Sequence, residues 1–359
     1  MRKFLGPLLR TTASAVALAA LPATAAARPV APPSPDAPRL SFERRHHAVQ
    51  HGGFVRAANA TISCRVPKSA ACRAVREGRT AVNGDFDMFY VDVDKDPNTY
   101  NSSRAEVRIP AGGRVTYARL YWGGNLRVGE QKPPKDNGRV LIAEPGGKYK
   151  ELLADTVVGH RVAQGADAYQ ASADVTKLVR NSGSGLYTVA QVNTAMGRSA
   201  AGAWGGWTLV VAYENPAEPL RDLSLWDGFD SLRSPMVIRL RGARVAAGAG
   251  GRVGLVAYDG DRGITGDSLT VSTGGKRKPV ALRDAADPAR DVLNSTISEP
   301  GNSPARRVPA FANTLGYDSD VFDFRSALRR DGDQLGFRLV SHRDAAWAGA
   351  LFVAVDARR

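Results

Sequence analysis

The sequence predicts an all-β protein made of two tandem units of β-sandwich or jelly-roll type, with a few short helices. Short runs of alternating or β-branched residues recur along the chain, and Gly, Asn, Asp and Pro separate them. Helical patterns are rare, and many short strands with Gly-rich turns favour a sandwich over a parallel α/β sheet. The clearest strand patterns cover residues 115–122, 187–192, 208–213, 236–240, 253–258 and 350–355.

The N-terminus has the pattern of an export signal. Arg2 and Lys3 precede an apolar run over residues 13–21, and small residues follow at 23–27. The apolar run is far shorter than the roughly 20 residues of a membrane-spanning helix. We therefore expect residues 1–27 to be a signal peptide that is cleaved near Ala27. The mature protein is then secreted, and no transmembrane segment remains in it.

Internal sequence similarity divides the rest of the chain into two expected units after a linker. Residues 28–51 are rich in Pro and Ala, which predicts an extended linker. Beyond the linker we expect one sandwich unit over residues 52–217 and a second over 218–359. Segments of the first unit resemble segments of the second in the same order and at similar separations, which is typical of a duplication. The matched segments are 113–124 with 251–261, 173–175 with 319–321, and 204–213 with 347–355.

Two short helices are expected between strands. Their patterns cover residues 175–180 and 321–329. Asp174 directly precedes the first pattern and is suited to be its N-cap, because its side-chain oxygen can accept a hydrogen bond from a free N–H of the first turn.

The chain has two cysteines, Cys64 and Cys72. In an exported protein we expect them to form a disulfide, since nothing outside the cell keeps thiols reduced. A loop this short stabilises the fold by about 2–3 kcal/mol on the chain-entropy model. A lone pair of thiols does not make a structural zinc site, which needs about four ligands.

The formal net charge is +14, from 49 Lys and Arg against 35 Asp and Glu. These basic residues form no long run and no basic helix, so we do not expect nucleic acid as a partner. A polyanionic cell envelope is the more natural partner, by general electrostatic attraction.

Three groups of aspartates are candidate calcium ligands. Calcium takes six to eight hard oxygen ligands, often from loop carboxylates and carbonyls. The alternative is that these aspartates serve turns and helix caps. The first group is Asp92, Asp94 and Asp96, and the second is Asp259, Asp261 and Asp267; Asp318, Asp320 and Asp323 form a third, similar cluster. We expect any calcium to be structural.

Tryptophans could form a flat platform for a sugar ligand, for which Trp122, Trp207 and Trp226 are the candidates. The alternative is that they fill the core, because each buries a large apolar surface. Enzymatic signals are weaker. Residues 266–269 match a short lipase and esterase signature, but no histidine has an aspartate three residues before it, and no Gly-x-Ser-x-Gly motif occurs. We assign no catalytic residue.

A series of ordered motifs resembles the N-terminal region of large secreted surface proteins of Gram-positive bacteria, which usually precedes repeated β-sandwich domains. The motifs lie at residues 61–64 with Cys72, and at 85–88, 91–94, 101–105, 118–124, 205–211, 227–229, 294–298 and 315–323. The family has no established activity, so the resemblance implies a location and an architecture. The repeats and the wall anchor do not follow here, which leads us to expect a free secreted form.

Together these patterns predict a secreted, non-enzymatic protein that is adhesin-like or binds the envelope. Its partner would be an envelope polymer, a glycan, or a host or matrix surface. A carbohydrate-binding module and a secreted hydrolase stay open as alternatives.

Overall fold

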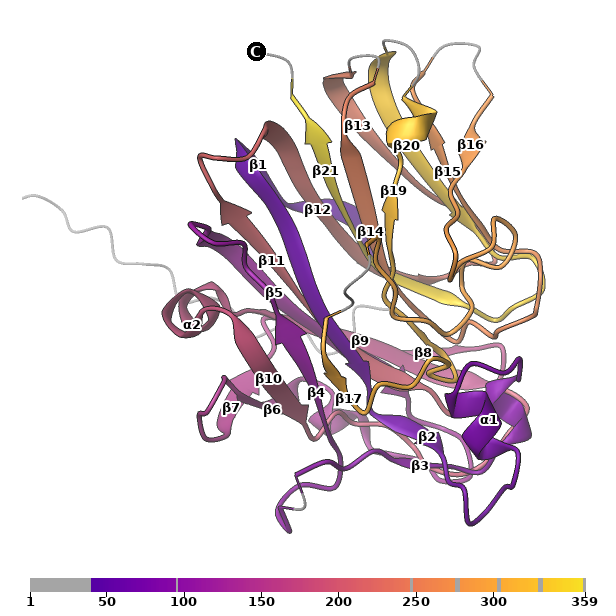
Figure 1. The fold of residues 1–359 in the computed structure, drawn as a ribbon. Helices are drawn as coiled ribbons and strands as arrows, with labels where there is room; N and C mark the ends of the chain where they lie inside the picture. Colours follow the sequence, from indigo (N-terminus) through magenta and orange to yellow (C-terminus); the bar gives the residue numbers. More distant parts are fainter. Residues whose placement is uncertain are drawn as a thin grey trace, which may run out of the picture. The chain divides into compact units, whose positions relative to one another are not determined.

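The computed structural model describes residues 40–94, 96–245, 248–274, 278–301, 305–328 and 332–357. The expected signal peptide and the first part of the expected linker lie outside these residues. The structure is mainly β, as the sequence predicts, and its strands are antiparallel (Figure 1).

The largest sheet has ten strands in the order β18-β14-β21-β12-β1-β11-β5-β9-β8, with β19 paired to β14. Its members are β1 (Leu40–Ala60), β5 (Arg114–Asn125), β8 (Thr156–Ala163), β9 (Ala166–Asp174), β11 (Gly205–Glu214), β12 (Leu220–Ser231), β14 (Gly251–Tyr258), β18 (Tyr317–Asp318), β19 (Val321–Asp323) and β21 (Trp347–Asp356).

Strand β1 joins two halves of this sheet. Residues 40–51 pair with β12, whereas residues 52–60 pair with β11 on the other side. We call β11, β5, β9 and β8 with residues 52–60 the first wing, and β12, β21, β14, β18 and β19 with residues 40–51 the second wing. Gly52 stands at the change of partner with a φ of 129°, which a residue with a side chain rarely adopts.

Two outer sheets cover the wings. The five-stranded sheet contains β4 (Ser102–Val107), β6 (Arg139–Ala143), β7 (Lys150–Leu153), β10 (Gly185–Ala190) and β17 (Arg307–Val308). The four-stranded sheet contains β13 (Met236–Val245), β15 (Ser268–Ser272), β16 (Val280–Ala281) and β20 (Gly332–Val340). A further pair is β2 (Ile62–Cys64) with β3 (Met88–Tyr90).

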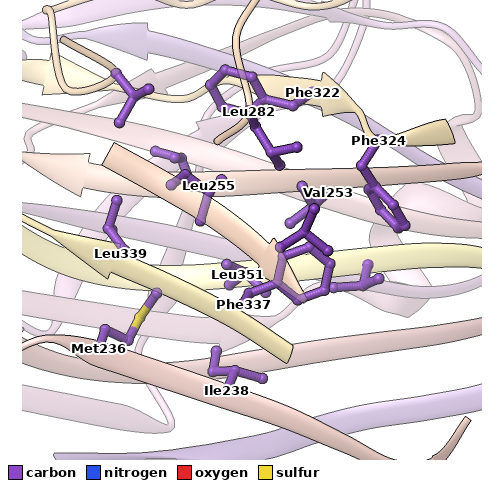
Figure 2. Packing of buried hydrophobic residues seen from close by; sticks show 14 of the residues in the cluster. Met236, Ile238, Val253, Leu255, Leu282, Phe322, Phe324, Phe337, Leu339 and Leu351 are labelled. Atoms are coloured by element: carbon purple, nitrogen blue, oxygen red, sulfur yellow. The ribbon is translucent and has the colours of Figure 1, made fainter. Parts of the chain in front are cut away.

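Three apolar cores separate four layers. One core lies between the first wing and the five-stranded sheet, and another lies between the second wing and the four-stranded sheet. Figure 2 shows the latter, where Phe337 and Leu339 of β20 meet Val253 and Leu255 of β14. Alternate residues of the same strands, such as Val256 on β14, face a third core that lies between the two wings. Successive side chains of a strand point to opposite faces, so a strand between two cores supplies apolar residues to both.

The predicted linker is wrong over residues 40–51, because these residues form the first half of β1 and pair with β12. No proline follows Pro38 in this stretch, so every backbone N–H can join a ladder. Glu43, Arg44 and Arg45 are exposed in succession next to shifts in the pairing register, and Arg45 forms an ion pair with the buried Asp227.

The first helix is confirmed as α2 (Thr176–Ser182), but its N-cap is Val175 and not the predicted Asp174. Asp174 lies one position earlier, where its Oδ1 accepts a 2.8 Å hydrogen bond from the Thr176 N–H. The helix expected over residues 321–329 is wrong at its start, where β19 pairs with β14 before a short 3-10 turn at Arg325–Ala327. Pairing along the sheet edge outweighs the weak local helix preference. Another helix, α1 (Cys72–Arg76), was not predicted.

The segments that resemble each other in sequence occupy corresponding places in the two wings. β5 pairs with β11, and β14 pairs with β21 in the same antiparallel manner. The duplication and the boundary between residues 217 and 218 stay predictions. β17, from the second expected unit, pairs with β4 in the outer sheet of the first.

The disulfide is confirmed. Cys64 at the end of β2 is bonded to Cys72 at the start of α1, with 5.8 Å between their Cα atoms. Among the described residues, no helix is both long and apolar enough to cross a membrane.

Candidate functional site

A groove of about 270 Å³ lies near Gly53, where β1 passes from one wing to the other. Its lining comes from β1, β11, β12, β14, β19 and β21 and from the loops that adjoin them. Segments far apart in the sequence thus meet at one surface because β1 belongs to both wings.

Ion pairs order one side of the groove. Arg221 donates to Glu218 Oε2 at 2.8 Å and to Asp356 Oδ1 at 3.1 Å. The Tyr213 hydroxyl donates to the same Glu218 carboxylate at 2.8 Å. Burial and the neighbouring Glu218 raise the pKa of Tyr213, so its hydroxyl keeps its proton at neutral pH. These groups satisfy one another's hydrogen bonds along one wall of the groove.

Two arginines in the groove differ from Arg221. Arg252 on β14 and Arg325 after β19 are exposed, and neither side chain forms an ion pair among the residues that the structure describes. Asp323 pairs with Arg252 across the sheet through its backbone, and its carboxylate accepts a hydrogen bond from the Arg325 N–H at 2.8 Å. The lining has equal numbers of arginines and acidic residues, so the groove has no excess of positive charge. What could attract an anion is the two guanidinium groups that form no ion pair.

The opposite end of the second wing holds a group of aspartates, here called the aspartate cluster. Its carboxyls lie where β14 ends and where β15 and β21 begin. Burial raises the pKa of each, to about 7 for Asp261, Asp267 and Asp287 and to about 8 for Asp344. The cluster comprises Asp259, Asp261, Asp267, Asp287, Asp291, Asp318, Asp320 and Asp344.

Hydrogen bonds hold the predicted members of the cluster. Asp259 Oδ1 accepts from the Asn83 side chain, and Asp261 Oδ1 accepts from the Asn83 backbone N–H, both at 2.8 Å. Asp267 Oδ1 accepts from the Ser341 hydroxyl at 2.8 Å. The second predicted aspartate group is therefore brought together with Asp318 and Asp320 of the third. Asp323 is not part of it and lies in the groove instead.

The first predicted group, Asp92, Asp94 and Asp96, lies in a loop before β4. Asp94 Oδ1 accepts from the Asp96 N–H at 2.9 Å, and Asp92 Oδ1 accepts from the Ser102 hydroxyl at 2.8 Å. Asp96 Oδ1 accepts from the Asn98 N–H. These bonds are those of turn-forming aspartates. In the described parts of the chain, no three acidic, histidine or cysteine side chains are arranged as a metal site.

Three members of the cluster were not predicted from the sequence. Asp287 and Asp291 come from the long segment between β16 and β17, and Asp344 comes from the turn before β21. The spacing of Asp284, Asp287 and Asp291 around Pro288 was the available signal, but it is also typical of turns.

The tryptophan platform is not supported for two of its three residues. Trp122 and Trp207 are 0% exposed, and their indole nitrogens donate to Asn137 O and Ser103 Oγ, each at 2.8 Å. Both belong to the core between the first wing and the five-stranded sheet. Trp226 is partly buried against the other outer core. The apolar area of these rings therefore serves packing.

The esterase-like segment lies in an antiparallel sheet. Ser268 begins β15 and pairs with Val340 of β20. In that enzyme class the serine follows a strand of an α/β sheet, so the surroundings of Ser268 differ from those that the signature requires.

Comparisons with known proteins assign no family. No protein-family description and no curated protein matches the chain. PNGase F from Flavobacterium meningosepticum is a similar solved structure, with 11% identity over 75% of this chain and 95% of that chain and a TM-score of 0.20. Quercetin 2,3-dioxygenase from Acinetobacter baumannii has 8% identity over 88% and 87%, with a TM-score of 0.21. The infectious bursal disease virus Gt strain has 11% identity over 90% and 74%, with a TM-score of 0.18.

Proposed function

We propose that this chain is an exported, non-enzymatic binding protein that holds an anionic polysaccharide of the cell envelope in the groove near Gly53. The observation that carries the proposal is the pair of exposed guanidinium groups of Arg252 and Arg325, neither of which has an ion-pair partner among the described residues. A guanidinium presents a planar fork of donors that matches a carboxylate or a phosphate group.

The surroundings of these arginines favour binding over catalysis. Arg252 is fixed to β14, which pairs on both sides, and Arg325 follows β19 directly. The carboxylates of Glu218 and Asp356 are already engaged with Arg221. The groove therefore offers donors on a rigid support, while its ordered carboxylates can accept hydrogen bonds from sugar hydroxyls.

Export is a separate part of the proposal. It is supported by the signal-like residues 1–27 and by the disulfide between Cys64 and Cys72. Disulfides persist in oxidising environments outside the cytoplasm. The positive net charge of +14 favours retention near an anionic envelope after export.

The binding test compares the protein with a double variant, Arg252→Gln with Arg325→Gln, in a titration with an acidic envelope polysaccharide. A hydrogen bond to a charged group contributes about 1.5–3 kcal/mol. We therefore expect the double variant to bind at least about tenfold more weakly, since about 1.4 kcal/mol corresponds to a factor of ten. Binding by the unaltered protein should also weaken as salt is added.

The matched control is Arg239→Gln with Arg338→Gln on the four-stranded sheet. Both residues are exposed and lie outside the groove, and the net charge changes equally. If the control loses as much affinity as the groove variant, attraction is only general and the groove is not the site. Equal binding of a neutral glycan would favour the carbohydrate-module alternative, and binding only to a matrix protein would favour an adhesin for host surfaces.

A further inference from the structure

Asp318 and Asp320 are both 0% exposed, and each has only one bonded oxygen. Asp318 Oδ1 accepts from the Thr296 N–H at 3.1 Å, and Asp320 Oδ1 accepts from the Ser298 N–H at 2.8 Å. The second oxygen of each carboxylate is buried and has no hydrogen-bond partner. A buried carboxylate oxygen without a partner is strongly disfavoured, so something must compensate these two.

The unpartnered oxygen of Asp318 lies close to Gly260 and to the main-chain oxygen of Leu293. A Cβ on Gly260 would lie 2.5 Å from Asp318 Oδ2 and 2.4 Å from Leu293 O, so only glycine allows the backbone to approach both oxygens. The two oxygens therefore lie within about 5 Å of each other. Two oxygens from distant segments of the chain therefore approach one point.

Near these two aspartates, carboxyl oxygens outnumber the hydroxyl and amide hydrogens that they could accept. The Thr296 hydroxyl has one hydrogen, yet its oxygen lies 2.8 Å from Asp287 Oδ1 and 3.0 Å from Asp320 Oδ1. Among the described residues, no lysine or arginine forms an ion pair with these aspartates. Arg56 and Arg307 act on Asp320 as positive charges only through space.

We propose that a calcium ion binds here, held by the free oxygens of Asp318 and Asp320 and by the main-chain carbonyl of Leu293. All three are hard oxygen donors, which calcium prefers, and it commonly combines carboxylates with backbone carbonyls and water. The site has no histidine or cysteine, which disfavours zinc and copper. The proposed site uses only two carboxylates, together with a carbonyl oxygen. It is therefore compatible with the finding that no three acidic, histidine or cysteine side chains form a metal site in the described chain.

The ion would join two segments of the second wing. One is the stretch from β18 to β19, which supplies Asp318 and Asp320, and the other is the segment around Leu293 and Thr296. Its role is therefore stabilisation of the second wing. The groove lies at the other end of that wing, so this inference does not depend on the proposed function.

The test measures binding of radioactive calcium by equilibrium dialysis, with the full oxidised chain first stripped by a chelator. We expect a saturable site, and a rise of several degrees in the unfolding temperature when calcium is added. Asp318→Asn and Asp320→Asn should each weaken binding at least tenfold and remove the rise. The matched control is Asp96→Asn, which alters a hydrogen-bonded loop aspartate and should leave both readouts unchanged.

Three results would overturn the site. One is an unaltered protein that binds no calcium at millimolar concentration, which would mean that the carboxyls are protonated or hydrated instead. Another is a pair of cluster variants that bind as the unaltered protein does. The third is loss of binding in Asp96→Asn alone, which would move the ion to the loop before β4. If the cluster variants do not fold, the affinities of the unaltered protein for calcium and for magnesium still test the proposal, because it requires tighter binding of calcium.

Discussion

The Tyr258 hydroxyl donates a 3.0 Å hydrogen bond to Gln170 Oε1, and this contact links β14 of the second wing to β9 of the first. The Gln170 amide nitrogen donates in turn to Gly228 O at 3.0 Å and to Gly349 O at 3.2 Å. All of these atoms are buried in the core between the wings. One side chain thus satisfies polar groups from three strands where no water can reach.

Replacing this side chain by Gln170→Leu should destabilise the protein by about 3 kcal/mol. The substitution leaves buried polar groups without partners, and each such group costs about 1–3 kcal/mol. Urea unfolding followed by circular dichroism measures the change. Gln50→Leu is the control, because Gln50 is half-buried and makes one hydrogen bond, to Thr116. Similar losses in both variants would contradict a special role for the bonds between the wings.

Gly52→Ala tests whether β1 must change partners at this residue. The new Cβ would lie 2.1 Å from Tyr213 O, and the φ of 129° is unfavourable for alanine. Strain and overpacking each cost about 1–3 kcal/mol, so we expect a loss of at least about 3 kcal/mol or failure to fold. Gly146→Ala is the control, because Gly146 has a φ of 72° and no atom within 4 Å of the new Cβ. It should lose only about 1 kcal/mol. Equal effects would mean that backbone strain alone matters.

The strands of the wings could be predicted because local sequence specifies them. β5 and β14 are marked by alternation and β-branched residues between glycines, and both are buried where the pattern predicts. The first half of β1 could not be predicted in this way. Its run Glu43, Arg44, Arg45, His46 and His47 looks solvated, and only pairing with β12 makes it a strand.

The candidate sites were harder to predict because they depend on long-range contacts. The sequence groups Asp318 and Asp320 with Asp323, but in the folded chain Asp287 and the Leu293 carbonyl lie beside the first two instead. The groove arginines gave no signal at all, since Arg252 and Arg325 meet through the pairing of β14 with β19. Trp122 and Trp207 were predicted as candidate ligand residues but are buried. A sugar platform and a packed core use the same residue type, so the sequence alone does not separate the two roles.

Removal of the disulfide should lower stability modestly. The bond joins residues eight positions apart, so Cys64→Ala with Cys72→Ala should cost about 2–3 kcal/mol. Urea unfolding of the double variant, compared with the oxidised protein, measures this difference. The reduced unaltered protein is the control and should behave like the variant. A variant as stable as the oxidised protein would mean that packing of α1 alone fixes this segment.

The stability of the calcium-free protein should fall as the pH rises from about 4 to about 8. Burial raises the pKa of Asp261 to about 7, and burial with the neighbouring Asp261 raises that of Asp344 to about 8. An unfolded aspartate has a pKa near 3.9, so in this window the folded state holds protons that the unfolded state has lost. By linkage, the free energy of unfolding must then decrease with rising pH. Urea unfolding in a chelator at several pH values measures the slope. Asp344→Asn should make the slope shallower, whereas stability that rises between pH 5 and 8 would show that these carboxyls are ionised in the folded state.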